Sequence, residues 1–110
     1  MSAVGEVRTF VEKVNRCPEH IKEEKNRVFQ FDIKESGSIQ IILKEGQAYL
    51  LEENLENPDV AMQLAERDLL KLLHGDLNPT MAFMTGKLKV DGKIGLALKL
   101  QELVRLYQEV

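Results

Sequence analysis

The spacing of apolar residues changes along the chain, and this change restricts the fold more than any other feature. Over residues 4–14 apolar residues recur every three or four positions, which places them on one face of a helix. Over residues 28–52 the spacing is two, as expected for strands with one buried face. Gly37 and Gly46 interrupt this stretch and predict tight turns. We therefore expect one helix followed by three consecutive antiparallel strands.

The second half of the chain predicts more helix than strand. Asn78 and Pro79 are typical of a helix start, and Gly75 and Gly86 of helix ends. The expected elements are a strand over 59–65, a helix over 66–74, a helix over 78–85, a strand at 88–90 and a helix over 93–107. The charged run 20–27 is expected to be a short helix or loop. The pattern predicts an α+β fold, with helices covering one face of the sheet.

Size and charge limit the classes of function. The chain has 110 residues, so we expect a single domain over residues 1–110. Its formal net charge of −3, with both signs interspersed, argues against a nucleic-acid partner. The single cysteine, Cys17, favours a reducing compartment, and no apolar run reaches the length of a membrane span or a signal peptide. The last residues also lack a Ser-Lys-Leu peroxisomal signal. We expect a cytoplasmic protein.

The residues that could carry catalysis lack suitable partners in the sequence. His20 and His74 are far apart in the chain and lack metal-ligand spacing, so His74 is better interpreted as a favourable charge at a helix C-terminus. Cys17 has no evident His partner, and no glycine-rich phosphate loop is present. We expect no catalytic residue, metal or cofactor.

Apolar residues in the second half exceed what one helix face needs. In the final helix Ile94 and Leu98 lie well away from the main apolar stripe, and residues 80–84 are apolar almost all round. Two interpretations remain open from the pattern alone. The surplus could be ordinary core or a dimer interface, or it could line a cavity in which methionines adapt to guests of different shape.

Residues 75–92, GDLNPTMAFMTGKLKVDG, followed by KIGLALKL, closely resemble the C-terminal half of sterol carrier protein type 2 domains. The shared pattern is a glycine, Asn-Pro, an aromatic residue, Gly-Lys-Leu-Lys, a glycine and a leucine-rich helix. Residues 28–33 and 65–73 are similar to the same family more loosely, whereas residues 1–27 match no motif of it. The resemblance implies a five-stranded, mainly antiparallel sheet with about four to five helices on one face, enclosing an apolar tunnel.

The resemblance also implies a function, which is non-catalytic binding and transfer of a fatty acid, fatty acyl-CoA, sterol or phospholipid. We expect a monomer that contacts membrane surfaces transiently. The alternatives are a dimer and an interaction module that docks an enzyme through the same apolar face. The residues that we expect to contact the lipid are Phe31, Met62, Leu73, Phe83, Met84, Ile94 and Leu98.

Overall fold

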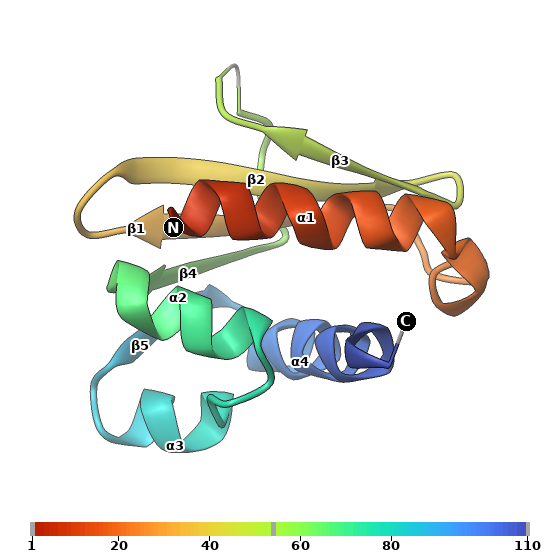
Figure 1. Ribbon diagram of the computed structural model, residues 1–110. Coiled ribbons are helices and arrows are strands. Elements are labelled where there is room, and N and C mark those ends of the chain that lie inside the picture. Colours follow the sequence, from red (N-terminus) through yellow and green to blue (C-terminus); the bar gives the residue numbers. More distant parts are fainter. Residues whose placement is uncertain (1, 54, 110) are drawn as a thin grey trace.

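The computed structural model describes residues 2–53 and 55–109 and contains a five-stranded sheet whose helices lie on one side (Figure 1). The elements in chain order are α1 (Ala3–Arg16), the 3-10 helix η1 (Pro18–His20), β1 (Arg27–Ile33), β2 (Gly37–Lys44), β3 (Gln47–Leu51), β4 (Val60–Leu64), α2 (Glu66–Leu73), α3 (Pro79–Met84), β5 (Leu88–Gly92) and α4 (Ile94–Gln108). The predicted fold class is confirmed, and so is each predicted strand. Of the charged run 20–27, only its first residue is helical, as the end of η1.

The strands lie in the order β3-β2-β1-β4-β5. Three neighbouring pairs are antiparallel, whereas β1 and β4 are parallel. Phe31 lies at the centre of the sheet, with Ile39 of β2 on one side and Met62 of β4 on the other. The parallel pair arises because the chain leaves the sheet edge at β3 and returns on the far side of β1.

The connection between β3 and β4 crosses the outer face of the sheet, behind β2 in Figure 1. The Gln40 side chain fixes this crossing, since its Nε2 donates to the Glu56 carbonyl at 2.7 Å and its Oε1 accepts from the Glu56 amide at 2.9 Å. Gln40 is fully buried, and its Nε2 also donates to Gln30 Oε1 at 2.8 Å. A buried amide is tolerated here because its polar atoms have partners.

The inner face of the sheet carries the core. Alternate residues of β1 point to this face and are buried, as the period-two pattern predicts, whereas β2 is buried continuously over residues 39–43. Helices α1, α2 and α4 lie over this face in Figure 1 and bury their own apolar stripes. The helical residues in the core include Val7, Phe10, Val11 and Val14 of α1, Leu69, Leu72 and Leu73 of α2, and Leu100, Leu103, Val104 and Tyr107 of α4. No helix among the described residues is both long and apolar enough to cross a bilayer.

Tyr107 fastens the C-terminal end of α4 to the first part of the chain. Its side chain is fully buried, and its hydroxyl donates to the carbonyl of Cys17 at 2.5 Å. The ring makes edge-on contacts with Phe10 and His20, with centroids 5.9 Å and 5.2 Å away. Burial raises the pKa of the Tyr107 phenol above its ordinary value of 10.0, because a phenolate would lose its hydration there.

The Tyr107→Phe substitution should lower the free energy of unfolding at neutral pH by about 1 kcal/mol, because it removes the hydroxyl bond to Cys17. The raised pKa in the folded state means that the phenol stabilises the fold below the unfolded pKa, and that this contribution is lost as pH rises through the folded pKa. The difference between wild type and variant should therefore shrink above about pH 10. Urea unfolding between about pH 8 and about pH 11 measures it, and a constant difference would contradict this account.

Candidate functional site

The short helix α3 is held at both ends by its own sequence. Asn78 caps its start, since Oδ1 accepts from the amides of Thr80 at 3.0 Å and Met81 at 3.2 Å. Its end is closed by the bond from the Lys87 amide to the Ala82 carbonyl at 2.9 Å, which passes around Gly86 with its positive φ of 80°. Ala82 is buried, and α3 packs on β5 and α4. The helix therefore has well-defined ends, although it is only six residues long.

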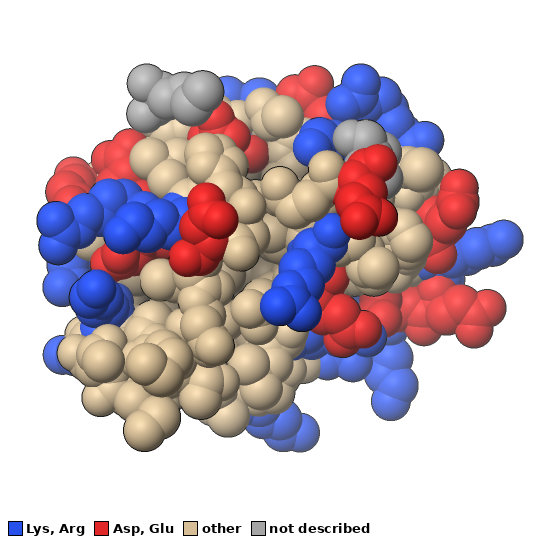
Figure 2. Space-filling model, turned by 60° about the horizontal axis from the view of Figure 1, so that its bottom comes forward, with Lys and Arg blue, Asp and Glu red and all other residues tan. Residues whose placement is uncertain are grey.

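Large apolar side chains on α3 and on the first half of α4 face water. Phe83 and Met84 of α3 are 46% and 75% exposed, and Ile94 and Leu98 of α4 are 38% and 39% exposed. Met81 of α3 is also exposed. Figure 2 turns the bottom of Figure 1 forward, the side on which α3 lies, and shows a broad area without charged side chains at its lower left. Contiguous exposed apolar surface of this kind usually marks a binding surface.

The other three predicted lipid contacts lie inside the molecule. Phe31 and Met62 are register partners on β1 and β4 and are essentially inaccessible, and Leu73 at the end of α2 is buried as well. The seven predicted residues thus form two groups, one buried beneath the helices and one exposed on α3 and α4. The structure does not bring the two groups together around one opening, and the described residues do not show the expected tunnel.

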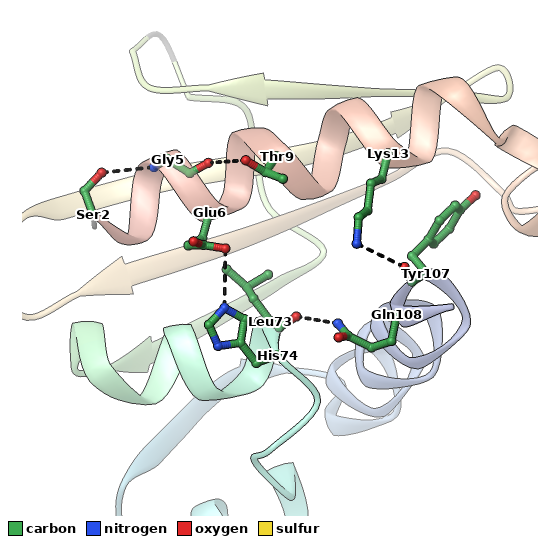
Figure 3. A network of polar contacts seen from close by, with 9 residues as sticks. All are labelled: Ser2, Gly5, Glu6, Thr9, Lys13, Leu73, His74, Tyr107 and Gln108. Atoms are coloured by element: carbon green, nitrogen blue, oxygen red, sulfur yellow. Dashed lines mark hydrogen bonds and ion pairs between the residues drawn. The ribbon is translucent and has the colours of Figure 1, made fainter. Parts of the chain in front are cut away.

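A small hollow lies between α1, the end of α2 and the end of α4 (Figure 3). Its volume is about 70 Å³, and its apolar lining includes Phe10, Leu73 and Tyr107. Pockets that hold small-molecule ligands usually measure roughly 300–1,000 Å³. A long acyl chain does not fit this hollow unless the helices around it move.

Polar contacts at the mouth of this hollow join its three helices (Figure 3). Gln108 Nε2 donates to the Leu73 carbonyl at 2.7 Å, and Lys13 Nζ donates to the Tyr107 carbonyl at 3.4 Å. His74, at the C-cap of α2, lies 3.4 Å from Glu6 of α1. These contacts could not be predicted from the sequence, because no local signal indicates which distant residue a Gln or Lys side chain will reach. The bonds of Gln108 and Lys13 hold the C-terminal end of α4 against α2 and α1.

The two histidines and the cysteine make contacts that hold parts of the fold together. Cys17 Sγ lies 3.7 Å from Glu19 Oε1, and its carbonyl accepts the Tyr107 hydroxyl. His20 packs its ring against Tyr107, whereas His74 lies beside Glu6. In the part of the chain that the structure describes, no three His, Cys, Asp or Glu side chains gather as a metal site would require.

Comparisons with known proteins agree with this fold. Hydroxysteroid dehydrogenase-like protein 2 of Rattus norvegicus is 41% identical over 80 residues, which are 70% of this chain and 15% of that protein. The chain therefore matches only a small part of that longer relative. The solution structure of sterol carrier protein domain 2 of Helicoverpa armigera is 27% identical, with a TM-score of 0.74 over 99% of this chain and 91% of that one.

Palmitated SCP2L2 from Aedes aegypti is also 27% identical, with a TM-score of 0.70 over 94% of this chain and 95% of that one. Residues 8–105 match the model of the SCP-2 sterol transfer family, which is nearly the whole chain. The match takes in most of α1, for which the sequence analysis found no family motif, as well as the α3 and β5 segment on which the resemblance was based. The chain therefore belongs to the SCP-2 sterol transfer family.

Proposed function

We propose that this chain binds one apolar lipid in a tunnel that opens between its helices and the sheet, and carries it through water. The observation that carries the proposal is the pair of apolar surfaces described above, one buried on the sheet and one exposed on α3 and α4, in a member of a sterol transfer family. The ligand class is a fatty acid, fatty acyl-CoA, sterol or phospholipid. The palmitated relative from Aedes aegypti supports an acyl chain as one such ligand.

The lining that we propose joins the two groups of residues. When α3 and the first half of α4 move away from the sheet, Phe83, Met84, Ile94 and Leu98 turn their side chains onto the lipid. Phe31, Met62 and Leu73 then meet its deeper end. Each methylene that leaves water contributes about 0.8 kcal/mol, so an acyl chain is held by shape and desolvation without any reactive group.

Movement is required because the hollow of about 70 Å³ is too small for such a ligand. The polar contacts of Gln108 and Tyr107 hold the C-terminal end of α4 in place. The first turns of α4 instead expose Ile94 and Leu98. The opening is therefore expected at α3 and the start of α4, with the far end of α4 as the fixed point.

A second candidate function is an interaction module without a lipid. The exposed apolar side chains of α3 and α4 would then pair two copies or dock the chain on an enzyme. This chain matches only 15% of the hydroxysteroid dehydrogenase-like relative, so a domain of this kind can accompany a larger enzyme. This observation favours the second candidate. A monomer with bound lipid argues for the carrier, and a lipid-free oligomer argues for the module.

Replacing Leu98 with Glu should reduce the affinity for a fluorescent fatty acid by at least about tenfold, because a carboxylate in an apolar tunnel loses its hydration. Phe83→Glu should have the same effect. The matched control is Leu106→Glu, since Leu106 is similarly exposed, at 40%, on the last turns of the same helix. Circular dichroism establishes that each variant is folded. Unchanged uptake by a folded Leu98→Glu variant would remove Leu98 from the lining.

Hydrogen exchange tests the proposed movement. Amides of α3 and of the first half of α4 should exchange faster than those of β1 and β4, because local opening exposes them without unfolding the sheet. Saturation with palmitate should slow their exchange, since the ligand occupies the opened site. The protein could take up lipid while the amides of α3 and α4 exchange as slowly as those of the central strands. That result would contradict this route of entry.

A further inference from the structure

The exposed side chains of α3 exceed what the proposed lining uses. Met81 is 58% exposed and is not among the residues that we expect to contact the lipid. Together with Phe83 and Met84 it gives a six-residue helix three large apolar side chains in water. Exposed apolar side chains gathered on one short helix usually mark a binding surface.

The charges around α3 are unlike those of the rest of the chain. Residues 77–98 contain Lys87, Lys89 and Lys93 but only one acidic residue, Asp91, which gives this segment a formal charge of +2. The whole chain carries −3, so the remaining residues carry −5. The α3 region is therefore a basic area on an acidic protein, and the partner that complements it is anionic.

Directly after α3, a hollow of about 230 Å³ opens on the outer side of the sheet. Lys34, Lys87 and Lys89 line it, and none of the three is in an ion pair among the described residues. Asp32 also lines the hollow, but its carboxylate accepts bonds from Gln30 at 2.9 Å and Ser38 at 2.5 Å. Three lysine ammonium groups around one concavity are suited to a phosphate group.

Figure 2 shows the uncharged area on the side of α3, with blue basic side chains at its left and lower borders and both blue and red side chains along its upper and right borders. Exposed apolar side chains next to basic ones are the pattern of proteins that lie on anionic membranes. A second copy of this chain fits less well, because a symmetric pairing through this face would bring equal positive charges together. Helix α1 does not offer the same surface, since its apolar residues are buried against the sheet.

We propose that α3 and the lysines of the adjacent hollow dock the protein on a bilayer that contains anionic phospholipids. The apolar side chains of α3 enter the headgroup region, and Lys87 and Lys89 bind lipid phosphates. This inference rests on the proposed function, because it places the region where the lipid enters directly on the membrane that supplies or receives it.

Vesicle sedimentation tests the docking surface. The wild-type protein should bind vesicles of phosphatidylcholine mixed with phosphatidylglycerol, and bind vesicles of phosphatidylcholine alone far less. The Lys87→Gln/Lys89→Gln variant should bind the mixed vesicles about 30-fold more weakly. The Met81→Ser variant should also bind more weakly, because less apolar surface enters the bilayer. The control is Lys22→Gln/Lys25→Gln, which changes two exposed lysines before β1 and should leave vesicle binding intact.

Uptake of a fluorescent fatty acid without vesicles, measured on the same variants, separates docking from lipid binding. All these variants should take up the fatty acid as wild type does, since none changes a proposed lining residue. If the wild-type protein takes up fatty acid but does not bind anionic vesicles, the docking proposal alone is overturned. Equal vesicle binding by every variant overturns it as well. A wild-type dimer that Met81→Ser converts to a monomer overturns it in favour of a second copy. Wild type that takes up no fatty acid contradicts the proposed function itself.

Discussion

Burial of the inner faces of β1 and β4 beneath the helices is the constraint on which the rest of the structure depends. Phe31 and Met62 are adjacent at the centre of this surface and are covered completely. Their burial fixes the parallel pair, and α4 closes the layer above the sheet. Among the described residues, this core holds no enclosed space of ligand size. In the proposed carrier, lipid and core compete for the same apolar surface, so uptake has to replace helix contacts with lipid contacts of similar free energy.

The two ends of α4 differ in what holds them. The last turns are fixed by Tyr107 and Gln108, whose hydrogen bonds reach Cys17 at the C-cap of α1 and Leu73 of α2. In the first turns, Ile94 and Leu98 keep apolar surface in water, while Lys99 forms an ion pair of 2.8 Å with Glu24. This ion pair is partly buried, with the Lys99 and Glu24 side chains 32% and 15% exposed, so it has to break when the start of α4 leaves the sheet. In the proposed opening, α4 separates from the sheet at its start and keeps its attachment at the other end.

The periodicity of the sequence predicted the elements because local chemistry decides them. Asn78 and Gly86 bound α3 by a side-chain cap and a left-handed residue, both of which depend on near neighbours. A helical wheel also places Leu98 off the buried stripe, and its side chain is 39% exposed, whereas the predicted contact with a lipid stays a prediction. Contacts between distant residues were not predictable. Gln40 of β2 bonds to Glu56 in the β3–β4 connection, and His74 at the end of α2 lies beside Glu6 of α1. No local signal in the sequence indicates either partner.

Native mass spectrometry of the freshly purified protein, followed by organic extraction, tests the central claim most directly. The account predicts a monomer with added mass that matches one fatty acid, fatty acyl-CoA, sterol or phospholipid, and the same lipid in the extract. It also predicts that protein stripped of lipid binds added lipid in a ratio of one lipid to one protein and regains the mass of the complex. A lipid-free dimer that takes up no added lipid would contradict the carrier and make the exposed face of α3 and α4 an interface between proteins.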